Sequence, residues 1–125
     1  AIAELEAVFA RNADRADGLT NQGNLAVARN DAAAAERLFE QAIRRDPHFV
    51  PAYVNLADLY RATGREPQAE STLRAGLAVV PQAPALHETL GLALVRQGRK
   101  NEALQEFTAA VNAAPEESRL AYVYA

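Results

Sequence analysis

Three prolines divide the chain at equal intervals. Pro47, Pro81 and Pro115 follow one another with a spacing of 34 residues (81 − 47 and 115 − 81). A fixed period of this length is typical of a solenoid, in which each unit buries its apolar side chains against the next unit. The period therefore restricts the possible folds more than any other feature of the sequence.

The period defines three complete units, residues 16–49, 50–83 and 84–117, in which proline occupies place 32. Places are counted from the first residue of each unit. Small residues recur where two helices must approach closely: Gly23, Ala57 and Gly91 at place 8; Ala35, Ala69 and Ala103 at place 20; Ala42, Gly76 and Ala110 at place 27. Place 24, where a gap must be filled, holds Phe39, Leu73 and Phe107.

This pattern resembles the tetratricopeptide repeat family, whose units have about 34 residues. The resemblance extends over the whole chain, although the tryptophan common at place 4 of the family is replaced by Leu19, Tyr53 and His87. It implies an all-α fold, a right-handed superhelical solenoid of antiparallel helix pairs.

Local signals agree with two helices in each unit. Turn residues interrupt each unit at Asn30-Asp31, Thr63-Gly64 and Gln97-Gly98. Asp31 is the predicted N-cap of a helix that runs to about Arg45. Asp46-Pro47 ends that helix, because proline disfavours helical geometry in the residue before it. No window alternates with a period of two, so no strand is predicted.

At both ends the pattern continues into incomplete units. Residues 1–15 match the second helix of a preceding unit, and residues 118–125 match the start of a following one. Neither segment has the polar outer face of a capping helix. We therefore expect a longer solenoid in the native protein, and we consider head-to-tail self-association through the exposed ends.

Catalytic and cofactor chemistry is not indicated. The chain has no cysteine, which removes thiolate catalysis and cysteine metal sites. Its two histidines, His48 and His87, occupy non-equivalent places without clustered carboxylates, so both are interpreted as satisfied structural residues. No glycine-rich phosphate motif is present. We predict a chain that is not an enzyme and binds no metal or cofactor.

Charge and hydropathy limit the possible partners. A net charge of −3 argues against nucleic-acid binding, which needs a basic patch. No apolar run approaches the length of about 18 residues expected of a membrane span, so no membrane insertion is predicted. The alanine and arginine content suggests a bacterial source. No targeting signal indicates a compartment, cytoplasmic or periplasmic.

The resemblance implies that the first helix of each unit lines a concave groove, at places 2, 5, 6, 9, 12 and 13. Such a groove holds a peptide or partner domain. From these places we predict the following partner-binding residues: Asn21, Asn24, Asn55, Asp58, Arg61, Glu88, Arg96 and Tyr122. Asparagine can bond a peptide backbone as donor and acceptor, and arginine and tyrosine are frequent hot-spot residues.

The best-known groove in this family is the carboxylate clamp for chaperone C-termini, which uses two asparagines and three cations. Asn24 and Asn55 match the asparagine positions, but the cation positions hold Thr20, Ala85 and Thr89. A bound carboxylate would lose water without gaining a charged partner, so this function is not expected.

Two functions remain open. The first is a protein-interaction scaffold that binds a peptide or partner domain in the groove. The second is a structural spacer or assembly module of a larger bacterial multidomain protein, for example a cytochrome-like one. Haem or catalytic motifs elsewhere in the full-length protein would favour the second.

Overall fold

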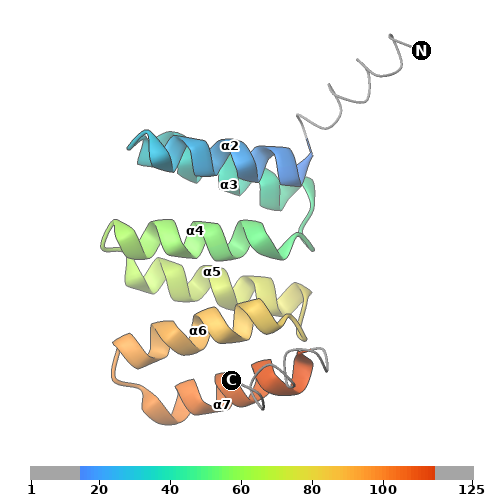
Figure 1. Ribbon diagram of the computed structural model, residues 1–125, viewed down its shortest axis with the longest axis vertical. Coiled ribbons are helices and arrows are strands. Elements are labelled where there is room, and N and C mark those ends of the chain that lie inside the picture. Colours follow the sequence, from blue (N-terminus) through green and yellow to red (C-terminus); the bar gives the residue numbers. More distant parts are fainter. Residues whose placement is uncertain (1–14, 115–125) are drawn as a thin grey trace, which may run out of the picture.

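The computed structural model describes residues 15–114, which form six helices and no strand (Figure 1). In chain order the helices are α2 Ala16–Ala28, α3 Ala32–Arg45, α4 Val50–Ala62, α5 Glu66–Val79, α6 Pro84–Arg96 and α7 Lys100–Ala113. The predicted partial units and Tyr122 lie outside this range, so the division of the chain into units remains a prediction.

The helix ends follow the local signals of the sequence. The Asp31 side chain accepts a hydrogen bond from the backbone N–H of Ala34 (3.2 Å) and caps α3, as predicted. The turn inside each pair contains one residue with positive φ: Asn30 (60°), Gly64 (76°) and Gly98 (76°). These residues are 34 positions apart, so the same left-handed turn recurs in each pair and favours glycine or asparagine.

The helices pair as α2 with α3, α4 with α5 and α6 with α7, and the pairs stack in one direction (Figure 1). Helix α4 packs directly on both α2 and α6, whereas no comparable contact joins the second helices α3, α5 and α7. The first helices are therefore closer together, and the stack curves around them. The predicted all-α solenoid of antiparallel helix pairs is confirmed, with α2, α4 and α6 on its inner, concave side.

In the first and third pairs the two helices approach closely between places 8 and 24. A Cβ atom added to Gly23 would lie 2.4 Å from the ring of Phe39, and one added to Gly91 would lie 2.6 Å from the ring of Phe107. Glycine therefore leaves the space that the phenylalanine ring fills. The middle unit combines the larger Ala57 with Leu73 at the same two places.

Successive units are joined by contacts that also repeat. The Tyr53 hydroxyl donates to the carbonyl of Pro47, and a ring nitrogen of His87 bonds the carbonyl of Pro81, both at 2.7 Å. At each of these junctions, the residue at place 4 fastens its helix to the loop that ends the preceding unit. Leu19 occupies the same place in α2 and has no polar group for such a bond.

A second repeated contact is an ion pair between residues 29 positions apart. Arg65 pairs with Glu36, and Nη1 of Arg99 donates to Glu70 (2.8 Å). Each pair connects the second helix of one unit to the turn of the next. Arg65 also lies over the ring of Tyr60, 4.4 Å from its centroid. These contacts lie away from the open side of the first helices.

We predict that Gly23→Ala destabilises the protein although alanine favours helix. The added methyl group overlaps the buried Phe39 ring, and overpacking of this kind costs about 1–3 kcal/mol, against a propensity gain of about 0.5–1 kcal/mol. Combining it with Phe39→Leu reproduces the residue pair of the middle unit and should recover part of the loss. Thermal unfolding followed by circular dichroism measures both. A more stable Gly23→Ala variant would contradict this account. So would a double variant whose loss of stability exceeds the sum of the losses of the two single variants.

Candidate binding surface on the concave face

Places 5, 9 and 12 of each unit follow the spacing i, i+4, i+7 and form one stripe along each first helix. The three stripes are Thr20, Asn24 and Val27 on α2; Val54, Asp58 and Arg61 on α4; and Glu88, Leu92 and Val95 on α6. Asp58 and Arg61 are exposed although α4 is covered by a helix on each side. Places 9 and 12 therefore face solvent inside the stack, and their exposure does not depend on where the stack ends.

The predicted binding residues within residues 15–114 all lie on α2, α4 and α6. Asn55 is half-buried, and the others are exposed: Asn21, Asn24, Asp58, Arg61, Glu88 and Arg96. None of the three asparagine side chains makes a hydrogen bond within the described range. Their donors and acceptors are thus available to a ligand.

Thr20 was predicted to lie in the groove because it occupies place 5, and this prediction is wrong. Its side chain is buried (3% exposed), and its hydroxyl donates to the carbonyl of Ala16 (2.7 Å). A threonine whose hydroxyl is satisfied within its own helix can be buried without an outside partner. The Thr89 hydroxyl likewise donates to the carbonyl of Ala85 (2.7 Å). The three cation positions of a carboxylate clamp are occupied by Thr20, Ala85 and Thr89, and the hydroxyl groups of both threonines are used within their own helices.

The two arginines of this surface differ in their contacts. Arg96 donates through Nη2 to Oε1 of Glu66 (3.0 Å), which ties α6 to the start of α5. Arg61 makes no direct ion pair among the described residues, although its positive charge acts on Asp58. Arg61 can therefore offer all its donors to a ligand, whereas Arg96 is held in place.

Asp58 is the carboxylate with an unusual environment. Asp58 is exposed as a residue, but partial burial of its carboxyl group raises the pKa above the ordinary value of 3.8, although the positive charges of Arg61 and Arg96 oppose this change. The two arginines therefore do not compensate for the loss of water around the carboxylate. A charged group that its surroundings disfavour marks a position where a ligand can improve the balance.

Two apolar residues were not selected from the sequence. Leu92 and Val95 are 49% and 47% exposed on the same stripe of α6. The choice of polar and aromatic groove residues passed over them. A comparison of equivalent places could have found them. Leu92 and Val95 occupy the same places as Asp58 and Arg61 in the middle unit, where polar residues indicate an exposed position.

The prediction that both histidines are satisfied structural residues holds for one of them. His87 is largely buried, and its ring nitrogens lie 2.7 Å from a carboxylate oxygen of Glu106 and 2.7 Å from the carbonyl of Pro81. The prediction of a satisfied structural histidine is confirmed there. For His48 it is wrong, because its ring is 72% exposed in a loop and lies 4.0 Å from Asp46. A ring outside the helix pairs has no packed neighbours to satisfy it.

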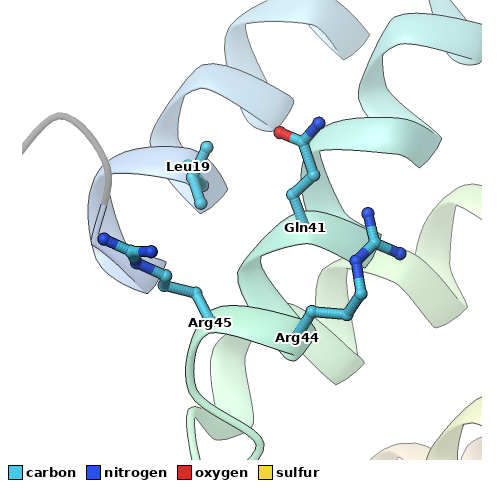
Figure 2. A pocket seen from close by; sticks show the side chains of 4 residues that line it. All are labelled: Leu19, Gln41, Arg44 and Arg45. Carbon is cyan, nitrogen blue, oxygen red and sulfur yellow. The ribbon is translucent and has the colours of Figure 1, made fainter.

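A hollow of about 340 Å³ lies at one end of the stack, away from the concave stripes. Figure 2 shows its lining, in which Leu19 of α2 faces Gln41, Arg44 and Arg45 of α3. Both arginines belong to the last turn of α3, where cations stabilise the helix dipole. A neighbouring hollow of about 390 Å³ shares Arg45. None of the described residues that line the two hollows is a predicted binding residue.

Within residues 15–114 no group of three or more histidine, aspartate or glutamate side chains is placed to hold a metal ion. No helix in that range is long and apolar enough to cross a membrane.

Comparison with known proteins identifies the family. Three models of the tetratricopeptide repeat match residues 26–92, 1–48 and 85–117. The first match alone includes more than half of the 125 residues. The chain belongs to the tetratricopeptide repeat family.

Solved structures agree with this assignment. A crystal structure of MamA is similar with a TM-score of 0.70 and 22% identity, over 87% of this chain and 63% of that one. The tetratricopeptide repeat domain of Sgt2 from Aspergillus fumigatus gives a TM-score of 0.69 and 26% identity, over 78% and 65% of the two chains. The chain thus spans less than two thirds of each of these structures.

One curated protein has a similar segment. The transcription factor tau 131 kDa subunit of Saccharomyces cerevisiae is 45% identical over 47 residues, which are 38% of this chain and 5% of that protein. Tetratricopeptide repeats are protein-interaction modules and are generally not catalytic. This tetratricopeptide repeat chain is therefore a protein-binding scaffold in the general sense. A bacterial source stays a prediction.

We predict that neutralising Asp58 and neutralising Glu70 change stability in opposite directions. Burial alone would raise the pKa of Glu70, but hydrogen bonds from Arg74 and Gln97 and the charge of Arg99 lower it. Glu70→Gln should therefore reduce the free energy of unfolding near neutral pH by about 1 kcal/mol. Asp58→Asn should increase it, because the folded state disfavours the Asp58 carboxylate.

The pH dependence of the two stability changes tests whether they have opposite directions. The gain of Asp58→Asn should fade as pH falls through the raised pKa toward 3.8, where both states are protonated. The loss of Glu70→Gln should persist down to the ordinary glutamate value of 4.5 and fade only below it. Thermal melts of both variants across this range supply the measurement. A destabilised Asp58→Asn at neutral pH would show that the carboxylate supports the fold.

Proposed function

We propose that this tetratricopeptide repeat chain binds an extended peptide segment of a partner protein along the concave face of α2, α4 and α6. One observation carries the proposal: several polar side chains on this face make no side-chain hydrogen bond or ion pair among residues 15–114, although Arg96 is paired with Glu66. Asn24, Asn55 and Arg61 are the main examples. Surface polar groups elsewhere, such as Glu36 and Arg99, are used in contacts between units.

The asparagines favour an extended ligand over a helical one. An extended backbone presents N–H and C=O groups that need partners, whereas a helix satisfies almost all of these groups internally. The asparagine amide supplies a donor and an acceptor at once and can bond both kinds of backbone group. Asn24 and Asn55 lie on neighbouring first helices, so one peptide crossing the stack can meet both in turn.

The spacing of the helices sets the ligand register. Helices in direct contact lie about 8–10 Å apart, and an extended chain advances about 3.3 Å per residue. A peptide that crosses the stack therefore advances by about three residues from one first helix to the next. About nine residues would contact α2, α4 and α6.

The test is selection of peptides from a displayed random library with the 125-residue chain, followed by calorimetric titration of synthetic peptides. The binding variant carries Asn55→Ala, Asp58→Ala and Arg61→Ala. Its matched control carries Arg37→Ala, Gln68→Ala and Ser71→Ala, three exposed positions on second helices. We expect the binding variant to lose at least about tenfold in affinity, because hydrogen bonds to charged and polar groups are removed.

The control should retain the affinity of the parent chain, and circular dichroism should show equal helix content in all three proteins. Peptides that bind the parent and the binding variant equally would contradict the concave site. Failure to select any peptide would favour the alternative of a structural spacer within a longer protein.

A further inference from the structure

We propose that the peptide bound on the concave face carries a basic residue and an apolar residue separated by two others. The lysine or arginine side chain contacts Asp58 on α4, and the apolar side chain covers Leu92 and Val95 on α6. The inference rests on the proposed function and assigns the chemistry of the ligand.

Leu92 and Val95 are exposed because they lie on the concave face, and not because a neighbouring helix is missing. Leu25 shows the contrasting case: it is 49% exposed at place 10, where Leu59 and Ala93 are buried. Leu25 is exposed because no described helix covers the outer side of α2. At places 9 and 12, by contrast, the residues of α4 are exposed between two neighbouring helices.

The two apolar residues form one contact area. Leu92 and Val95 are three positions apart in α6, so their side chains lie next to each other on the same stripe. None of the helices in residues 15–114 covers them, and the equivalent places in α4 are exposed although helices lie on both sides of α4. An apolar side chain from outside the chain would remove this surface from water.

The charges of the face favour a basic ligand. Asp17 lies 3.8 Å from Arg15, and Arg96 is paired with Glu66. The charged side chains that remain without direct pairs on the described face are Asp58, Arg61 and Glu88. Two carboxylates and one guanidinium give a net negative surface, and the whole chain has a net charge of −3. A positively charged segment is attracted to such a surface.

Asp58 is the point of contact that the cation would occupy. Its carboxylate is disfavoured by burial, and neither arginine nearby forms a direct ion pair with it. A lysine or arginine can lay its aliphatic stem along apolar surface while its charge reaches a carboxylate. Leu92 occupies on α6 the place that Asp58 occupies on α4, so the apolar residue of the same peptide reaches Leu92 while the basic residue contacts Asp58.

The alternative is an acidic ligand that pairs with Arg61. Its carboxylate would lie beside Asp58, three positions away on the same helix, and like charges at that distance repel. A cation on Asp58 would meet the same repulsion from Arg61, so the preference for a basic ligand follows from the net negative charge of the face. The acidic ligand is one outcome of the test.

The spacing follows from the two helices. Asp58 and Leu92 lie at the same place of neighbouring units, and an extended peptide advances about three residues between neighbouring first helices. The basic and apolar residues are therefore at positions i and i+3 of the ligand. Which of the two comes first depends on the direction in which the peptide runs.

The experiment measures fluorescence anisotropy with the 125-residue chain and labelled peptides built on the selected sequences. One series keeps the basic and apolar residues at i and i+3. The others shorten the spacing to i+2, replace the basic residue by glutamate, or replace the apolar residue by serine. We expect the first series to bind at least about tenfold more tightly than each of the others.

Protein variants separate the two contacts. Asp58→Asn should reduce the preference for the basic residue over its glutamate replacement, and Leu92→Ser should reduce the preference for the apolar residue over serine. Leu25→Ser is the matched control, because Leu25 and Leu92 are both 49% exposed and only Leu92 lies on the concave face. The control should leave both preferences unchanged.

The outcomes are distinguishable from those of the proposed function. Selected peptides that bind the concave face but contain no basic and apolar pair at this spacing would overturn the inference and leave the proposed function standing. Tighter binding of the glutamate series would assign the face to an acidic ligand, also against the inference. Absence of any peptide binding would overturn both.

Discussion

The solenoid depends on the close approach between place 8 and place 24 within each helix pair. The Phe39 ring fills the space above Gly23, and the Phe107 ring fills the space above Gly91. This contact is made inside one pair, and the residue types that make it recur every 34 positions. The repeated pairs stack in one direction, which brings α4 into contact with both α2 and α6 and places their stripes next to one another. The concave face is thus a consequence of packing on the opposite side of the same helices.

Contacts between pairs use a separate set of residues. The bonds from Tyr53 and His87 join first helices to the preceding loops, and the ion pairs of Glu36 and Glu70 join second helices to the following turns. Neither set occupies places 9 or 12. The residues at these places are therefore free to differ in each unit without loss of the fold. Asp58, whose charge the fold disfavours, stands at such a place.

Much of the fold could be predicted because it repeats every 34 residues. Turn-forming residues located the turns, and the period agrees with them, since Asn30, Gly64 and Gly98 are equivalent positions with the same left-handed backbone. Contacts between units could not be predicted in the same way, because ion partners such as Glu70 and Arg99 are 29 residues apart and meet only after stacking. Thr20 was misplaced because a general list of groove positions does not account for a hydroxyl satisfied inside its own helix. Leu92 lies at a predicted groove place but was not selected, because the selection contained only polar, charged and aromatic residues.

The places that pack the helices keep one kind of residue in every unit, whereas the exposed places of the concave face vary from unit to unit. Places 8, 20 and 24 hold the same kind of residue in all three units, whereas place 9 holds Asn24, Asp58 and Leu92. A ligand bound along this row, as proposed, would meet an amide, a carboxylate and an alkyl side chain in a fixed order. The row is not palindromic, so a peptide that satisfies it in one direction cannot do so in the other. The same packing that makes the units equal therefore lets unequal side chains give the surface a direction.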